Sequence, residues 1–304
     1  MVVSHDAGGA EIVSSWVRRN PQHRYRFVLA GSAISIFKSK IPSIINESFS
    51  KLADSIEDSD FILTGTSESA TLEKTAIKIA KTVGVKVTSF LDYWYGYLIR
   101  FQYKGQITLP DEIWVGDEYA LQEAKRTFPG KKIILRPNPY LLDIAEEKDR
   151  IASKIKKNNS LNILYLCQPF DEENTGENGQ TVYVTDITGL EYFFKCLCTN
   201  DYVPSKVSEI RMRMHPAEKR EKYQDVLSRY DTRFTIKKSK NQSLVEDCVW
   251  SDWAVGMHSN ALVVALTLGT KSFHCIPPGG KPCVLPHKEI GSFERYILSN
   301  EKHL

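Results

Sequence analysis

The stretch Asp60–Leu91, DFILTGTSESATLEKTAIKIAKTVGVKVTSFL, decides the fold class of this chain. Its first residues, Asp60–Thr64, form an apolar run of the length of a buried strand. A Gly-Thr-Ser turn follows, and leucine, alanine and isoleucine then recur at helical spacing from about Ser69 to Val83, before Gly84. A second apolar run covers Val85–Leu91. Two apolar strands joined by an amphipathic helix predict a parallel sheet with both faces covered.

The same alternation extends through residues 1–142. A helical pattern of apolar residues runs from Ile12 to Val17. Further strands are predicted at Val2–Ser4, Tyr25–Ala30, Glu112–Val115 and Lys132–Leu135. We therefore expect an α/β domain with a Rossmann-like parallel sheet over residues 1–142.

The pattern restarts after the most charged stretch of the chain, residues 143–160 (DIAEEKDRIASKIKKNNS). We predict a helix followed by a polar linker from Lys156 to Ser160, and place the domain boundary there. Strands are then predicted at Leu161–Cys167, Ser208–Met214, Arg233–Lys237, Ser251–Val255 and Ser272–Ile276, with helices at Gly189–Thr199, Pro216–Tyr230 and Asn260–Leu268. Residues 160–304 are thus expected to form a second Rossmann-like lobe, and ligands to bind in a cleft between the lobes.

Composition and charge exclude several classes of protein. The 304 residues carry 40 Lys and Arg against 37 Asp and Glu, a net charge of +3, which is too small for a nucleic-acid binder that acts by bulk charge. No apolar run reaches the length of a membrane span, and the N-terminus lacks the pattern of a secretory signal. The six cysteines form no C-x-x-C pair, so reduced thiols in a cytoplasmic protein are expected. Whether the basic linker contacts a membrane surface is left open.

A first candidate site is the turn Ser4–Glu11, which follows the first predicted strand. His5 or Asp6 can act there as a general base, and Gly8 and Gly9 let a ligand approach the backbone. The run is not a G-x-G-x-x-G motif, so a nicotinamide fingerprint is absent. The alternative is a tight turn in which Asp6 only caps the following helix.

Two turns of the second lobe are candidates for phosphate binding. In the first, His215 precedes Pro216, which is predicted to begin a helix, and the imidazole would donate to a phosphate or ribose. The second turn precedes a helix and contains Gly256, His258, Ser259 and Asn260. For both turns the alternative is an ordinary helix cap.

Other polar groups also follow predicted strands. Gln168 and Glu172 lie after the first strand of the second lobe, and the loop Asn174–Gln180 suits a mobile lid, although its carboxylates can equally be solvated. Lys237–Lys240 is interpreted as a solvated strand exit. In the first lobe, an aromatic segment suits a sugar face or a packing cluster, and its candidate sugar-binding residues are Asp92, Tyr93, Trp94 and Arg100.

These features together resemble GT-B glycosyltransferases, which have two Rossmann-like lobes. The second lobe resembles bacterial sialyltransferases and Kdo transferases over about residues 160–290. The resemblance rests on His215-Pro216, which matches their HP motif, and on Gly256–Ala261 with Ser259, which matches their serine-bearing phosphate motif. The D/E-D/E-G motif of some sialyltransferases is absent, although Asp171–Glu173 is acidic in a comparable place. The first lobe resembles these families only in architecture.

The resemblance implies transfer of a nonulosonic or Kdo-like acid from a CMP donor to a hydroxyl of a glycan acceptor. Asp6 or His5 would deprotonate the acceptor, and His215 and Ser259 would stabilise the departing phosphate. Neither a metal ion nor a cofactor is expected. Three alternatives stay open: a UDP-sugar 2-epimerase, a polyol-phosphate transferase, and a non-catalytic protein that binds a nucleotide sugar.

Overall fold

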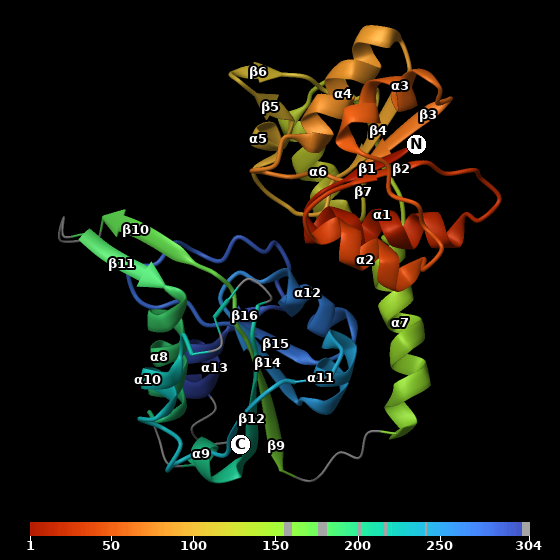
Figure 1. The fold of residues 1–304 in the computed structure, drawn as a ribbon. Helices are drawn as coiled ribbons and strands as arrows, with labels where there is room; N and C mark the ends of the chain where they lie inside the picture. Colours follow the sequence, from red (N-terminus) through yellow and green to blue (C-terminus); the bar gives the residue numbers. More distant parts are fainter. Residues whose placement is uncertain are drawn as a thin grey trace. The chain divides into compact units, whose positions relative to one another are not determined.

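A computed structural model describes residues 1–154, 160–175, 181–199, 202–215, 218–219, 221–240 and 242–299. The chain divides into two compact units, which are described separately here: unit 1 is Met1–Asp143 and unit 2 is Ile144–Leu304 (Figure 1). None of the helices in the described ranges has both the length and the apolar character that crossing a bilayer requires. The predicted linker, Lys156 to Ser160, falls mostly outside the described residues, of which it includes only Ser160.

Unit 1 is built on a six-stranded sheet in the order β2-β1-β3-β4-β7-β8, in which every pairing is parallel. Its strands are β1 (Val2–Ser4), β2 (Phe27–Leu29), β3 (Phe61–Thr64), β4 (Lys86–Phe90), β7 (Glu112–Val115) and β8 (Lys132–Leu135). All six lie within the predicted runs or coincide with them. The strands are apolar on both sides because both faces of this sheet are covered.

Two apolar layers cover the faces of this sheet. One layer packs α1 (Ala7–Arg19) and α2 (Ser32–Lys40) against side chains such as Val2, Leu63 and Trp114. The opposite layer includes α3 (Leu52–Glu57), α4 (Leu72–Val83), α5 (Tyr97–Phe101) and α6 (Glu118–Thr127). A short ribbon, β5 (Gln102–Tyr103) and β6 (Gln106–Ile107), follows α5, and α7 (Pro139–Ile151) crosses from unit 1 into unit 2.

Unit 2 has its own six-stranded parallel sheet, in the order β13-β12-β9-β14-β15-β16. Its strands are β9 (Leu161–Leu166), β12 (Val207–Arg213), β13 (Ile236–Lys238), β14 (Trp253–Gly256), β15 (Lys271–His274) and β16 (Gly291–Ser292). The strand order reverses between β9 and β14, which is the topological switch point of a doubly wound sheet.

Helices cover both faces of this second sheet (Figure 1). On one face, an apolar cluster is enclosed by α8 (Asp186–Leu197), α10 (Gln224–Leu227) and α13 (Phe293–Ser299). On the other face lie α11 (Leu244–Trp250) and α12 (Asn260–Thr267). A short helix, α9 (Tyr202–Lys206), precedes β12. The fold class is thus confirmed as α/β with two Rossmann-like parallel sheets.

One prediction for unit 2 was wrong. The helix expected over Pro216–Tyr230 is absent from the described residues of that range except for the single turn of α10, and i to i+3 turns take its place. Among the described residues of this range, the buried apolar side chains are Tyr223, Val226 and Leu227. The described residues before them are polar and offer no apolar face that could pack a helix against the sheet.

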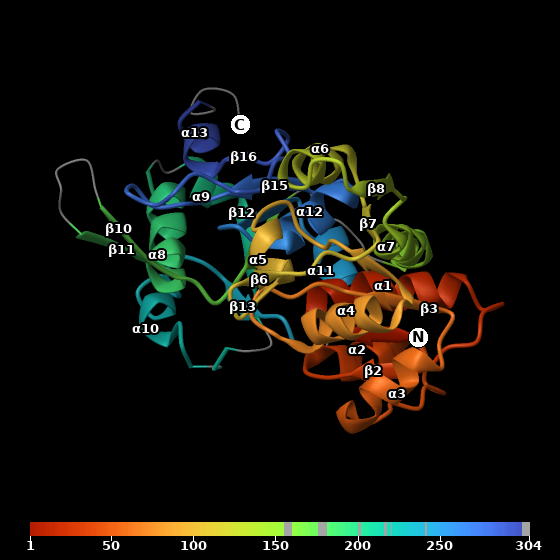
Figure 2. The ribbon, with the colours of Figure 1, turned by 90° about the horizontal axis from the view of Figure 1, so that it is seen from above.

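Part of the expected lid, Asn174–Gln180, is a strand. Asn174 and Thr175 belong to β10 (Asp171–Thr175), which pairs antiparallel with β11 (Thr181–Thr185), and the remaining residues of the lid lie outside the described ones. This hairpin extends from the rest of unit 2 beside α8 (Figure 2). Its acidic strand was missed because it lacks the apolar character that marked the other strands.

Candidate functional site

His5 and Asp6 form the turn between the end of β1 and the start of α1. Asp6 occupies the N-cap position of α1, but its side chain makes no cap hydrogen bond. One carboxylate oxygen, Oδ1, instead accepts from Nδ1 of His5 at 2.7 Å, and Oδ2 accepts from the Ser67 hydroxyl at 2.5 Å. The alternative in which Asp6 only caps the helix therefore does not describe this turn.

The Asp6 contact determines which nitrogen of His5 can act as a base. A carboxylate only accepts hydrogen bonds, so Nδ1 carries the proton and Nε2 is the nitrogen with a free lone pair. The imidazole is about one third exposed and lines a cavity of about 350 Å³ together with Phe49 and the segment 69–72. The ring lies against Gly31, where an added Cβ would come within 2.7 Å of it.

Glu73, in the first turn of α4, is a buried carboxyl beside this pair that the sequence analysis missed. Its Oε1 accepts from the backbone N–H of His5 at 2.7 Å, and its Oε2 has no hydrogen-bond partner among the described residues. Burial raises the pKa of Glu73 to about 7. The one available signal was a glutamate on the apolar face of an amphipathic helix, between Leu72 and Ala76.

Gly8 and Gly9 allow other groups to come close to the backbone of α1, and in the structure those groups are parts of the protein itself and not a ligand. A Cβ on Gly8 would lie 2.1 Å from Asp92 Oδ2, and a Cβ on Gly9 would lie 3.0 Å from the backbone nitrogen of Thr66. The N-terminal end of α1 thus faces the Asp92 carboxylate, which the helix dipole favours. A ligand at these glycines stays a prediction.

The aromatic segment after β4 is held mainly by internal contacts. Arg100 is buried and donates to Asp92 Oδ1 at 2.8 Å, and Trp94 donates from its indole nitrogen to Asp117 at 2.8 Å. Tyr93 contacts Trp94 and Tyr95, and the rings of Tyr93 and Trp94 are partly exposed. These contacts describe a packing cluster, and sugar binding by the two partly exposed rings stays a prediction.

In unit 2, the exits of three neighbouring strands carry most of the predicted nucleotide-binding residues. Gln168 follows β9, His258 and Ser259 follow β14, and His215 follows β12. The side-chain oxygen of Gln168 accepts from the backbone N–H of His258 at 3.0 Å, which joins the two exits at the switch point. Strands lie about 4.8 Å apart, so β12 and β14, separated by β9, are about 10 Å apart.

His258 and Ser259 are both engaged with the protein. His258 is buried, packs on Phe170 with 5.2 Å between ring centroids, and accepts from the Val284 N–H at 3.4 Å. Burial lowers the pKa of His258 below its ordinary value. The Ser259 hydroxyl caps α12 by accepting from the N–H of Ala261 at 3.2 Å, so its proton is still able to donate.

The other members of this turn lie beside the cap. Gly256 ends β14 where a Cβ would stand 3.1 Å from the carbonyl oxygen of Leu166, so glycine allows the exits of β9 and β14 to come together. Asn260 is the first residue of α12 and is partly exposed.

His215 does not stand at the start of a helix, which corrects the prediction for this residue. Its backbone N–H donates to Glu218 Oε2 at 3.0 Å, and the N–H of Glu218 donates back to its carbonyl, which closes a turn. The residue is exposed, desolvation by the surrounding chain lowers the pKa of its ring, and Glu218 opposes that effect. Pro216 lies outside the described residues.

Glu172 was predicted to bind the sugar or acceptor. It lies on β10, where its carboxylate pairs with Lys281 and accepts from the Asn174 side chain at 3.2 Å. A role of Glu172 in sugar binding stays a prediction.

Comparisons with solved structures identify the architecture. The chain is similar to the UDP-GlcNAc 2-epimerase from Methanocaldococcus jannaschii, at 10% identity and a TM-score of 0.55, with 90% of this chain and 82% of that one covered. A putative UDP-N-acetylglucosamine 2-epimerase from Listeria monocytogenes gives 10% identity and a TM-score of 0.59, with 90% and 78% covered. MurG from Acinetobacter baumannii is similar at 11% identity and a TM-score of 0.52, with 98% of this chain and 83% of that one covered. At this level of identity the comparisons establish a GT-B-like two-lobed architecture.

No family model matches the sequence, and no curated protein matches it either.

Proposed function

We propose that this chain is an enzyme that transfers a sugar from a nucleotide-activated donor to a hydroxyl group of a glycan. The observation that carries the proposal is the His5–Asp6 pair at the exit of β1, a general base with its orienting carboxylate, in a chain of GT-B-like architecture. The donor is a CMP-activated nonulosonic or Kdo-like acid. That assignment rests on the resemblance of residues 160–290 to sialyltransferases and Kdo transferases.

In this proposal His5 is the base and Asp6 is a positioning residue. Nε2 of His5 takes the proton of the acceptor hydroxyl, and Asp6 holds the ring in the required tautomer and stabilises the imidazolium that forms. Ser67 fixes the second oxygen of Asp6. Glu73 accepts from the backbone N–H of His5, so the residue is held through its backbone as well as through its ring.

Unit 2 binds the nucleotide in this proposal. The Ser259 hydroxyl donates to a phosphate oxygen while it caps α12, and the positive end of the helix dipole at Asn260 adds to the attraction. His215 supplies a second donor at the exit of β12, which β9 separates from β14. Gln168, Gly256 and His258 shape the backbone between these donors. Fixed donors of this kind stabilise the phosphate as it leaves.

A second candidate is epimerisation of a UDP-sugar. Two epimerase structures, with TM-scores of 0.55 and 0.59, are among the folds to which this chain is similar, and this likeness is the observation that supports the second candidate. An epimerase interconverts its nucleotide sugar and needs no acceptor, so the products separate the two candidates.

The experiment supplies the protein with CMP-N-acetylneuraminate, CMP-Kdo or UDP-N-acetylglucosamine, each with and without a mixture of oligosaccharide acceptors. Transfer predicts that CMP is released from a CMP-sugar only when acceptor is present, and that the sugar appears on the acceptor. Conversion of UDP-N-acetylglucosamine to its 2-epimer without acceptor would establish the second candidate. Absence of turnover with all three donors would overturn both.

A further inference from the structure

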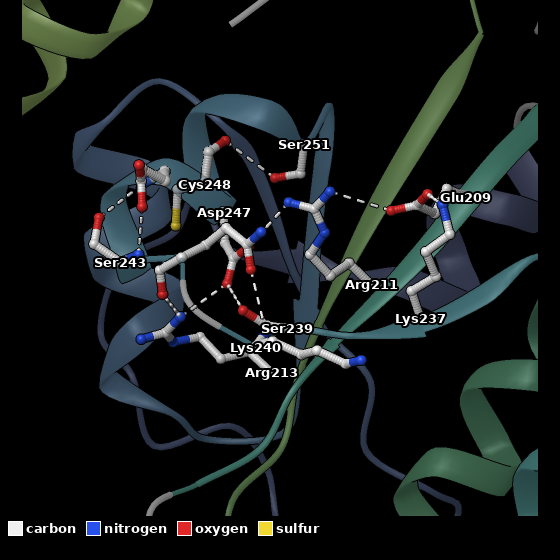
Figure 3. Close-up of polar contacts among 12 residues, drawn as sticks. Glu209, Arg211, Arg213, Lys237, Ser239, Lys240, Ser243, Asp247, Cys248 and Ser251 are labelled. Carbon is white, nitrogen blue, oxygen red and sulfur yellow. Dashed lines mark hydrogen bonds and ion pairs between the residues drawn. The ribbon is translucent and has the colours of Figure 1, made fainter.

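A second cluster of chemistry in unit 2 lies on the sheet face beside α11, outside the proposed nucleotide site. It surrounds Asp247, whose carboxylate is fully buried. Asp247 accepts from Arg211 Nη1 at 3.1 Å, from Arg213 Nη1 at 2.8 Å and from the Ser239 hydroxyl at 2.6 Å (Figure 3). One carboxylate therefore holds two guanidinium groups from the same strand, β12.

Arg211 is fixed in place from three sides. Its second terminal nitrogen, Nη2, donates to Glu209 at 3.2 Å, and its guanidinium carbon lies 3.6 Å from the centroid of the Trp250 ring. Two of its five N–H groups therefore go to carboxylates, and the planar group keeps further donors in a fixed orientation. Such a guanidinium loses little freedom when it binds an anion, which favours binding.

A cavity of about 480 Å³ opens beside this network. Its described lining residues are Arg211, Lys237, Lys238, Lys240 and Gln242, and none of these carries a carboxylate. Its size is within the range of small-molecule sites. Counting the two carboxylates behind it, Glu209 and Asp247, against the five cations Arg211, Arg213, Lys237, Lys238 and Lys240 leaves an excess of three positive charges.

We propose that this cavity is a binding site for a phosphoryl group, carried either by a saccharide phosphate or by free pyrophosphate. A guanidinium held flat matches the geometry of phosphate oxygens, and flanking lysines add charge without demanding one orientation. The sequence interpretation of Lys237–Lys240 as a solvated strand exit was incomplete, since Ser239 reaches Asp247 and Lys237 pairs with Glu209. The inference holds whether or not the chain transfers a sugar.

The test measures binding of inorganic pyrophosphate to the whole protein by titration calorimetry at low salt. We compare the wild type with the double variant Lys237→Gln/Lys240→Gln. Glu209 keeps its contact with Arg211 in this variant, so the network behind the cavity persists. The matched control is Lys132→Gln, because Lys132 and Lys237 are 63% and 61% exposed and each pairs with a glutamate.

We expect pyrophosphate to bind the wild type and the control equally, and to bind the double variant about tenfold more weakly, since charge-assisted contacts are lost. Thermal midpoints establish that all three proteins are folded. Equal affinity in the double variant, or no binding to the wild type, would overturn the proposal. A parallel loss of CMP binding in the double variant would also overturn it, because the cations would then belong to the nucleotide site.

Two further titrations separate the sources of the phosphoryl group. Glucose 1-phosphate and glucose are titrated into the same proteins. Tighter binding of glucose 1-phosphate than of pyrophosphate identifies a saccharide phosphate, and the reverse order identifies free pyrophosphate. Binding of uncharged glucose that the double variant leaves intact would contradict an anion site.

Discussion

Three side chains around the β1 exit, His5, Asp6 and Glu73, have distinct parts in the chemistry proposed for unit 1. His5 presents Nε2, Asp6 orients its ring, and Glu73 holds its backbone N–H. Of these, the sequence indicated His5 and Asp6, because they follow a predicted strand. Glu73 was not indicated, since the contact with His5 joins residues 68 positions apart, and only the parallel pairing of β1 with β3 brings them together.

At this scale we predict that Asp6→Asn lowers turnover while leaving nucleotide binding intact. The asparagine side chain can present its amide to Nδ1, which would favour the wrong tautomer of His5 and remove the negative charge beside the imidazolium. The expected loss of kcat is about 10²- to 10⁴-fold, the range attributed to a general base. His5→Ala should fall in the same range, and Asp54→Asn, at an exposed position on α3, serves as the control. If both site variants keep the wild-type kcat, the His5–Asp6 pair does not act as the general base.

The raised pKa of Glu73 predicts that the free energy of unfolding depends on pH. Its pKa is raised by burial from 4.5 to about 7 in the folded chain, so between these values the folded state binds more protons than the unfolded one. Stability from this group is therefore fully present below about pH 4.5 and is lost as pH rises through 7. The loss amounts to about 3 kcal/mol at most.

The measurement is urea unfolding at pH 5, 6, 7 and 8 for the wild type and for Glu73→Gln. Glutamine keeps an acceptor for the His5 N–H and cannot ionise, so this contribution should vanish in the variant. If both proteins lose stability in parallel over this range, Glu73 is not the titrating group.

At the scale of elements, the N-terminus of α12 is the feature that links stability to the proposed ligand. Ser259 caps this helix, and a cap is all that the structure requires of it. Ser259→Asp separates the two roles, because aspartate caps as well as serine but places a negative charge where the phosphate would bind. We expect an unchanged thermal midpoint and a CMP affinity at least about tenfold lower.

The contrasting variant is Ser259→Ala, which removes the cap and should cost about 1 kcal/mol of stability. Titration calorimetry and thermal unfolding of both variants complete the comparison. An aspartate variant that binds CMP as the wild type does would restrict Ser259 to the capping role.

The elements that could be predicted from sequence are those whose own residues are apolar enough to indicate burial. Strands such as Glu112–Val115 and Leu161–Leu166 are apolar and are enclosed on both faces, so their existence and parallel pairing followed from local pattern. The hairpin Asp171–Thr185 carries no such pattern in its acidic strand. Strand order could not be predicted, because it depends on pairings between distant segments, and the Asp247 network depends on that order.

For the whole molecule, we propose a catalytic base in unit 1 and a nucleotide-binding site in unit 2. The GT-B-like architecture is established by the two parallel sheets and by structures that align over 90% or more of the chain. The identity of the nucleotide is central to the proposed transfer. Both candidate functions need a nucleotide sugar, but transfer uses a CMP-sugar and epimerisation uses a UDP-sugar.

The most direct measurement is the thermal midpoint of the wild-type protein with CMP, CDP, UDP and GDP, each at a saturating concentration. A ligand at about 100 times its Kd stabilises the native state by about 2.7 kcal/mol, which should raise the midpoint by about 5 °C or more. We predict that CMP produces this shift and that UDP and GDP do not. A shift with UDP and none with CMP would contradict it.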